Sequence, residues 1–221
     1  MNFPNAEEEM RERLTEAASL LSHLRATAPA AMTPLDDLQK AQRGLWLVSV
    51  YAAFERGANA VVEAALEDIS NHGPKSIESV PPIHALFHFP RVQSVKDCGY
   101  ANVFESSISM FQASLSDAPL RTKDNPLAKY LQNVDGSTLE WVCLLFGALP
   151  YSVTGANRGR LNTLRERRNA VAHGRESASK VGEPYSLNEL QNVYDAADAE
   201  LLRFKLHMEA YCNQRLYIRA A

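Results

Sequence analysis

The sequence contains no long apolar run. No stretch approaches the roughly 18 consecutive apolar residues that a membrane-spanning helix needs, and the first ten residues are acidic where a signal peptide would be basic and then apolar. These absences predict a soluble, cytoplasmic protein that does not use a membrane. Hydrophobic residues still make up 46% of the 221 positions, which is enough for a substantial core and excludes a disordered chain.

The sequence also lacks an excess of positive charge and a cysteine framework. Its 23 basic and 26 acidic residues give a net charge of −3, so a general cationic coat for nucleic acid or anionic lipid is excluded, and any such partner must use a local patch. The three cysteines, Cys98, Cys143 and Cys212, are far apart and form no C-x-x-C pair. This pattern suggests neither a disulfide framework nor a thiolate zinc site, and we interpret each cysteine as a small buried apolar residue.

Strand signals are scarce, whereas helix signals recur along the chain. No segment alternates between apolar and polar residues for long, and the Asp-Gly pair at 135–136 leads into a helix and not into a hairpin. Apolar residues instead recur at steps of three and four. The pattern predicts an all-α bundle of five to seven helices, in a single domain over residues 1–221 and without internal repeats.

Start and stop signals give approximate bounds for these helices. Hydroxyl residues followed three positions later by an acidic residue, at Thr33, Ser137 and Ser186, are interpreted as helix caps. The helices are expected at about 5–27, 34–70, 100–115, 139–149, 160–173 and 187–218. The last would span about 45 Å over roughly thirty residues. Residues 75–135 are the least regular part, with a short apolar segment at 81–90 and a loop at 116–136.

Positive charge is concentrated in one segment, residues 157–176. This segment holds six arginines, no lysine and two glutamates, so its charge is +4 and the rest of the chain carries −7. Arginine in place of lysine favours bidentate contact with phosphate or carboxylate. A solvated helix face is the alternative interpretation of the same residues.

Arg168 occupies an unexpected position within this segment. On a helix it falls inside the apolar stripe that Leu161, Leu164 and Val171 form. A guanidinium there costs on the order of several kcal/mol unless it is paired, reaches a wet cleft or faces a second subunit. The position of Arg168 therefore points to a special contact.

Arg165, Asn169 and His173 form a ridge beside that stripe. Asn169 and His173 are four residues apart and can touch, whereas Arg168 and His173 point too far apart for direct contact. His173 ends the helix, and a histidine can give and take a proton near neutral pH. An arginine and a histidine without metal ligands suit the cleavage of RNA. There the 2′-hydroxyl attacks the adjacent phosphorus, the histidine moves a proton and the arginine stabilises the phosphoryl charge.

The run Arg168-Asn169-Ala170-Val171-Ala172-His173-Gly174 resembles the R-x4-6-H motif of HEPN domains, in which asparagine commonly follows the arginine. An apolar helix before this run, a polar loop after it and a long closing helix resemble the RiboL-PSP-HEPN group from about residue 40 onward. The resemblance implies an up-and-down, HEPN-like bundle that dimerises with the motif helices facing each other, so that two arginines and two histidines line one cleft. Many members are metal-independent endoribonucleases, found as toxins or in phage defence, whereas others only bind RNA, nucleotides or a partner protein.

The resemblance also implies roles for individual residues. Arg168 would stabilise phosphoryl charge, His173 would be the general acid or base, and Asn169 would orient the imidazole or bind phosphate. Four further arginines would bind RNA. Arg165 and Arg175 would hold the RNA backbone, whereas Arg158 and Arg160 would only steer the RNA toward the site. No metal or cofactor is expected. The expected partners are RNA and a second copy of the chain, and an antitoxin or defence-system protein is a further candidate.

Simpler interpretations stay open. Arg168 can pair with a buried carboxylate, for example Glu55, and His173 can merely cap its helix. His84 and His88 are spaced like helical metal ligands, but no H-E-x-x-H motif is present, so a packed histidine pair is favoured. The protein would then be a non-catalytic helical module that binds RNA or a partner protein.

Overall fold

The structure is a computed structural model that describes residues 2–30, 33–122 and 124–219. These residues form nine α-helices and no β-strand, so the predicted all-α class is confirmed, whereas the predicted number of five to seven helices is too low. The α-helices are α1 (Phe3–Ala26), α2 (Asp37–His72), α3 (Pro81–Phe87), α4 (Phe89–Asp97), α5 (Val103–Ser114), α6 (Gly136–Phe146), α7 (Gly155–Ala172), α8 (Ala178–Gly182) and α9 (Leu187–Asn213). Three 3₁₀ turns accompany them: η1 (Ser76–Glu78), η2 (Tyr100–Asn102) and η3 (Tyr130–Gln132). Within the described ranges, no helix has both the length and the apolar composition that crossing a bilayer demands.

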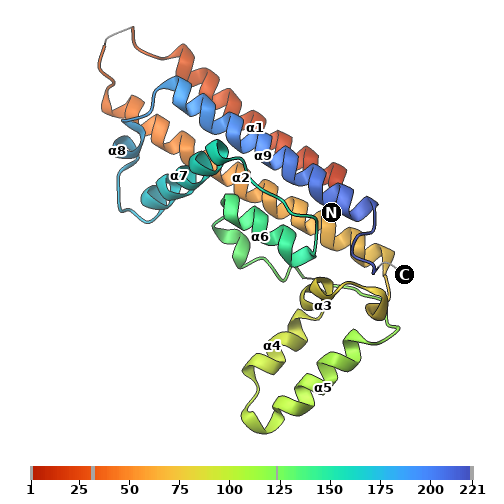
Figure 1. The fold of residues 1–221 in the computed structure, drawn as a ribbon. Helices are drawn as coiled ribbons and strands as arrows, with labels where there is room; N and C mark the ends of the chain where they lie inside the picture. The colour runs from red at the N-terminus through yellow and green to blue at the C-terminus, as the bar shows by residue number, and fades with distance from the viewer. Residues whose placement is uncertain (1, 31–32, 123, 220–221) are drawn as a thin grey trace.

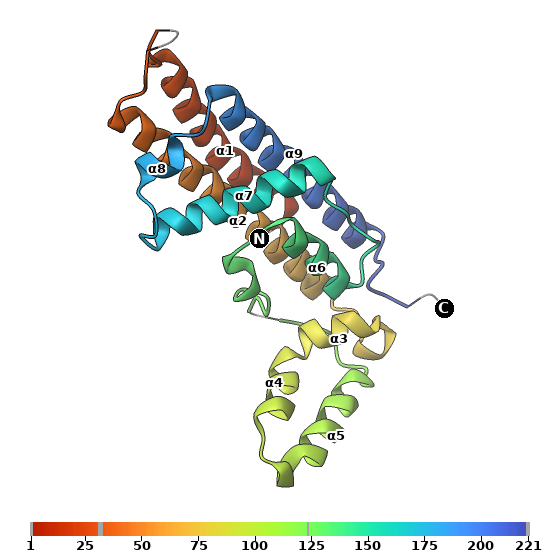
Figure 2. The same ribbon diagram turned by 60° about the vertical axis from the view of Figure 1, so that its left-hand side comes forward.

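The long helix α2 is the centre of the bundle. Helices α1 and α9 lie along it on one side, and α6 and α7 cover it on another (Figures 1 and 2). Its apolar positions repeat at helical spacing and are almost fully buried, as Leu47, Phe54 and Val61 illustrate. A Cβ added at Gly57 would lie 2.8 Å from Met10 Cγ on α1 and 2.9 Å from Leu201 Cδ1 on α9. A small residue at this point therefore lets the three long helices approach closely.

Two helices begin at an aspartate and not at the hydroxyl residue that the sequence suggested. The Asp36 carboxylate accepts from the Gln39 backbone N–H at 2.7 Å, and the Gln39 side chain accepts from the Asp36 N–H at 3.1 Å. Asp135 forms the same reciprocal pair with Thr138, at 2.8 and 3.2 Å. The predicted caps at the start of α2 and α6 are therefore wrong, because a carboxylate nearby closes a capping box first.

At the other helix ends, some predictions are confirmed and others are wrong. The capping box at Ser186 is confirmed, with the Ser186 N–H donating to Glu189 at 2.6 Å. Helix α7 begins earlier than predicted, at Gly155, and α9 ends at Asn213. The chain reverses just after α9 at Arg215, whose φ is +52°, so residues 216–218 leave the helix that was predicted to include them.

The loop between α7 and α9 contains a helix that the sequence did not reveal. Helix α8 lies against the start of α2, where a Cβ on Gly44 would be 2.0 Å from Ala178 O and one on Gly182 would be 2.0 Å from Lys40 O. Two glycines on facing helices thus permit backbone contact. Lys40 Nζ also binds Glu183 Oε1 at 2.7 Å. The segment was mistaken for a polar loop because glycine carries no apolar signal.

The middle of the chain forms a hairpin of two helices, α4 and α5, that projects from the bundle (Figures 1 and 2). The helix expected at 100–115 is present as η2 and α5, whereas the segment expected at 81–90 is α3 and the start of α4. The loop expected at 116–136 contains η3, and its residue 123 lies outside the described residues. Neither α4 nor α5 contains a buried residue.

The cysteines follow the prediction in two cases of three. Cys143 and Cys212 are buried, and burial raises the pKa of the Cys143 thiol to about 12, so it stays protonated. Cys98 is only half-buried, and its Sγ–H donates to Val95 O at 3.2 Å. The prediction of full burial is wrong for Cys98 because it follows α4, which belongs to the projecting hairpin.

Candidate nucleic-acid site

Helix α7 carries the candidate site on a firmly anchored apolar face. Leu161, Leu164 and Ala170 are buried, and Val171 packs against the core beside them. The helix lies across α2 and next to α6 (Figure 2). The stripe predicted from the sequence therefore faces the core, and Arg168 lies within it.

The Arg168 guanidinium lies between α7 and α2. Its Nη2 donates to Glu55 Oε2 at 3.1 Å and to Oε1 at 3.4 Å, and its carbon lies 4.6 Å from the centre of the Tyr51 ring. Its Nη1 donates to Asn169 Oδ1 at 2.9 Å. The side chains of Arg168 and Glu55 are each 23% exposed. The pairing that the sequence left open as an alternative is therefore present, at a half-buried position that solvent still reaches.

Burial disfavours the ionised form of two side chains that contact the guanidinium, Glu55 and Tyr51. Burial raises the pKa of Glu55, although the Arg168 charge and Tyr51 oppose the rise. Burial, and then the negative charge of Glu55, raises the pKa of the Tyr51 hydroxyl, so the phenol stays protonated. The guanidinium has five N–H groups, and the contacts to Glu55 and Asn169 leave some of them for another acceptor.

His173 lies one residue beyond the last residue of α7 and is exposed. Its backbone N–H donates to Asn169 O at 3.1 Å, and Gly174 then turns the chain with a φ of +64°. In the part of the chain that the structure describes, the imidazole of His173 has no hydrogen-bond partner. The predicted contact between the Asn169 and His173 side chains is not present, because Asn169 accepts from Arg168 instead.

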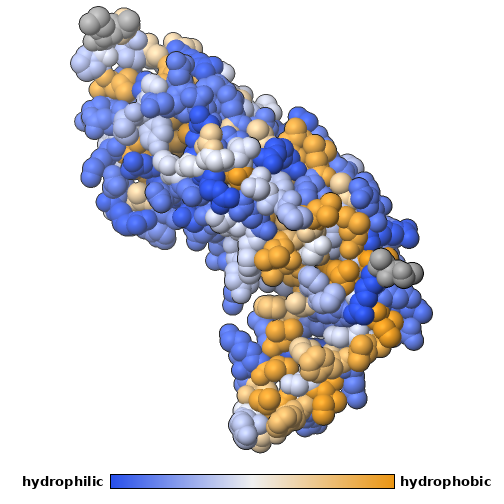
Figure 3. All heavy atoms as spheres, viewed as in Figure 1, coloured by the Kyte–Doolittle hydropathy of each residue, from blue (hydrophilic) through white to orange (hydrophobic). Residues whose placement is uncertain are grey.

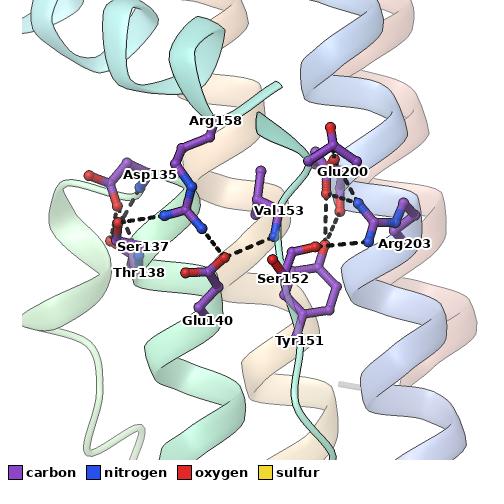
Figure 4. Close-up of polar contacts among 11 residues, drawn as sticks. Asp135, Ser137, Thr138, Glu140, Tyr151, Ser152, Val153, Arg158, Glu200 and Arg203 are labelled. Atoms are coloured by element: carbon purple, nitrogen blue, oxygen red, sulfur yellow. Dashed lines mark hydrogen bonds and ion pairs between the residues drawn. The ribbon is translucent and has the colours of Figure 1, made fainter. Parts of the chain in front are cut away.

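The remaining arginines of the segment fall into two groups. Arg158 is paired with Glu140 and Arg165 with Asp135, both on α6 or at its cap, so a neighbouring carboxylate compensates their charge (Figure 4 shows the first pair). Three arginines form no ion pair among the described residues: Arg160, Arg167 and Arg175. The positive charge available to a ligand is therefore smaller than the sequence count suggests.

A buried carboxylate on α9 holds the start of α7 and was missed in the sequence. The side chain of Glu200 is 0% exposed and accepts from Arg203 Nη1 at 2.7 Å, from Asn157 Nδ2 at 2.8 Å and from the Tyr151 hydroxyl at 3.0 Å (Figure 4). Leu201 beside it on α9 is also buried. An acidic residue inside the apolar pattern of α9 was the signal that could have revealed this cluster.

The two histidines considered as metal ligands occupy a different place. His84 Nε2 lies 3.1 Å from Ser79 O, and His88 Nε2 lies 3.1 Å from Ser76 Oγ. Their ring centres are 6.0 Å apart. Each ring thus has its own hydrogen-bond partner at the base of the hairpin, which agrees with a packed histidine pair.

An all-α bundle with an Arg-Asn-x-x-x-His sequence at the end of a core-facing helix defines a HEPN-type module. The chain belongs to the RiboL-PSP-HEPN family, whose family model matches residues 8–210. The match begins well before residue 40, where the resemblance was first visible, so α1 is part of the family's pattern. No curated protein and no solved structure matches the chain.

Proposed function

We propose that the protein is a metal-independent endoribonuclease in which Arg168 and His173 act on the RNA backbone. The observation that carries the proposal is the exposed His173 imidazole, which has no side-chain partner among the described residues and follows, five positions along the chain, an arginine whose guanidinium Glu55 and Asn169 hold in place. Three arginines of the same segment, with which no described residue forms an ion pair, supply attraction for phosphate.

The chemistry follows from these groups. A His173 imidazole takes the proton of the 2′-hydroxyl, whose oxygen attacks the neighbouring phosphorus. The bond from phosphorus to the 5′-oxygen breaks, that oxygen receives a proton, and the product strand ends in a 2′,3′-cyclic phosphate. Arg168 donates to the phosphoryl oxygens as their charge grows. In a dimer with the motif helices facing each other, one His173 takes the proton and the other supplies one.

A second function rests on a different observation. Carboxylates compensate the charges of Arg168, Arg165 and Arg158, as they would in a framework that only holds α7 to its neighbours. The alternative is therefore a non-catalytic HEPN-type module that binds RNA or a partner protein through its uncompensated arginines.

Cleavage in the presence of a chelator distinguishes the two functions. The purified protein is incubated with mixed RNA in excess EDTA, and fragments with cyclic-phosphate ends are measured. We expect His173→Ala and Arg168→Ala to lose most of the activity, because general acid–base catalysis alone contributes about 10²–10⁴-fold. His23→Ala and Arg13→Ala on the exposed side of α1 are matched controls and should cleave like the parent protein.

Other outcomes of this experiment decide against the enzyme. Equal cleavage by all variants would assign the activity to a contaminant or another site. RNA binding without cleavage on many substrates would favour the binding module. If the enzyme acts as a toxin or in phage defence, its expression should slow cell growth and the His173→Ala variant should not. Sedimentation as a strict monomer during active cleavage would contradict the shared cleft.

A further inference from the structure

The hairpin helix α5 and the residue that ends it carry a stripe of exposed large apolar side chains. The exposed fractions are 74% for Phe104, 56% for Ile108, 61% for Phe111 and, directly after the last residue of α5, 63% for Leu115. Figure 3 shows hydrophobic atoms gathered at the hairpin end of the molecule, whereas the opposite end is mostly hydrophilic. Isolated apolar residues are normal on a protein surface, but a continuous stripe of this size marks a contact surface.

The stripe is not the face that joins α5 to α4. The half-buried positions of α5 include Val103, Ser107, Met110 and Ala113, which are mostly small, and the hairpin is also held by Arg91 Nη1 donating to Ser109 Oγ at 2.9 Å. The larger apolar side chains are thus on the outer face. A surface helix normally buries its most apolar face, whereas no other described residue of the chain covers the main apolar face of α5.

The spacing of the stripe indicates what covers it. Consecutive members of the stripe are four, three and four positions apart, which is the alternating spacing found where two helices pack side by side. This series of spacings is the same in both directions along the helix. Two identical helices that run antiparallel about a two-fold axis can therefore match every side chain. We propose that α5 packs antiparallel on α5 of a second copy, with Phe104 against Leu115 and Ile108 against Phe111 across the axis.

The area of the stripe suits this contact. An aromatic side chain buries about 150–250 Å², and the four side chains of the stripe, two of them aromatic and each more than half exposed, together present roughly 450–500 Å² in one copy. Two copies would then bury about 1,000 Å² in total, the area at which a specific protein interface becomes distinguishable from a chance contact. The stripe is therefore large enough for self-association and small enough for a reversible one.

Charge does not oppose the pairing. Glu105 is the sole charged residue of α5. In the antiparallel arrangement Glu105 lies beside Gln112 of the second copy, so the two glutamates do not face each other. A like-charge pair at the edge of the seam, which would weaken a symmetric contact, is thereby avoided.

The proposed contact is independent of the candidate nuclease site. The hairpin projects from one end of the bundle, whereas α7 lies across α2 within it (Figure 2). A dimer through α5 therefore leaves the α7 face open. Should the α7 faces also associate, the two symmetric contacts together give an assembly larger than a dimer.

The test uses two charged variants that are complementary only across an antiparallel seam. Phe111→Glu and Ile108→Lys each place an unpaired charge in the contact and should weaken self-association about 30-fold or more. Mixed in equal amounts, they bring the introduced carboxylate of one variant opposite the introduced ammonium group of the other and should regain the parent mass in sedimentation velocity. Leu38→Glu, at a position on α2 that is 68% exposed, is the matched control and should keep the parent mass.

Thermal melting followed by circular dichroism shows whether each substitution destabilises the fold of the single chain. The substituted side chains are exposed in one chain, so the melting temperature of dilute monomer should be unchanged. A parent protein that is a strict monomer, or a Phe111→Glu variant with the parent's mass, would overturn the proposal. If Phe111→Glu leaves the mass of the pure protein unchanged but abolishes binding of another protein, the occupant is that protein and the proposed second copy is wrong.

Discussion

Arg168 and Glu55 form a half-buried ion pair between α7 and α2, with Nη2 3.1 Å from one carboxylate oxygen and 3.4 Å from the other. The carboxylate orients the guanidinium and also competes with any phosphate for it. Removing the charge of Glu55 without changing its shape therefore separates binding from catalysis.

We expect Glu55→Gln to bind RNA about threefold to tenfold more tightly, because one negative charge near the phosphate is lost. The same variant should cleave bound RNA about tenfold more slowly, because Arg168 is held less firmly. Single-turnover cleavage over a range of protein concentrations measures both effects. Unchanged binding and unchanged cleavage together would show that Glu55 does not act on Arg168 during the reaction.

The two groups of arginines predict different salt dependences of RNA binding. Arg175 forms no ion pair among the described residues, whereas Arg165 is paired with Asp135. We expect Arg175→Ala to reduce the slope of log affinity against log salt by about 0.7, the value for one phosphate contact on a single strand. Arg165→Ala should change that slope less. The same slope in the parent protein and in Arg175→Ala would remove Arg175 from the interface.

The contact between α8 and α2 predicts a large effect from one methyl group. A Cβ on Gly182 would lie 2.0 Å from Lys40 O and 2.5 Å from Gly44 N, both backbone atoms that cannot move alone. Gly182→Ala should lower the free energy of unfolding by about 1–3 kcal/mol. Gly159→Ala, on α7 with open space around the added Cβ, is the control and should raise it by about 0.5–1 kcal/mol. Chemical denaturation measures both, and equal effects would contradict the close approach.

The buried Glu200 cluster predicts a second stability effect. Glu200→Gln keeps the shape of the side chain but turns an amide NH₂ toward the donors of Asn157, Tyr151 and Arg203. We expect a loss of about 1–3 kcal/mol, the cost of leaving a buried donor without an acceptor. Asp198→Asn, exposed on the same helix, should change stability by less than about 0.5 kcal/mol. Thermal unfolding at pH 7 tests this difference.

The attachment of α1 to α2 should depend on pH. The Arg56 guanidinium, with Nε 2.7 Å from Glu9 Oε1, lowers the pKa of Glu9 below its ordinary value. The fold thus prefers the ionised carboxylate. Its contribution is fully present above the ordinary pKa of a glutamate and is lost as the pH falls through the lowered one.

We expect Glu9→Gln to lower the free energy of unfolding at pH 7 by about 0.5–1 kcal/mol and to have little effect at a pH below the lowered pKa of Glu9. Melting temperatures from pH 2.5 to pH 7 measure this convergence. A difference between the parent protein and the variant that stays constant with pH would show that the pair does not contribute through its charge.

The sequence by itself determined the helical class and the family. Apolar residues at three- and four-residue steps leave a helix as the only element that can bury them on one face. The Ser186 capping box is a local signal, which is why the start of α9 was predicted correctly, and the predicted ends of α2 and α7 lie close to the observed ones. Arg168 was singled out for the same reason, because its place in an apolar stripe needs only the helical period.

The tertiary structure decided which groups surround those residues. Whether Arg168 would meet Glu55, whether Asn169 would turn to Arg168 or to His173, and whether α8 would form at all depend on contacts between segments far apart in the chain. Helical periodicity shows which side chains share a face, but it does not reveal which other helix covers that face. None of the described residues covers the apolar stripe of α5, and in the proposed dimer a second copy covers it.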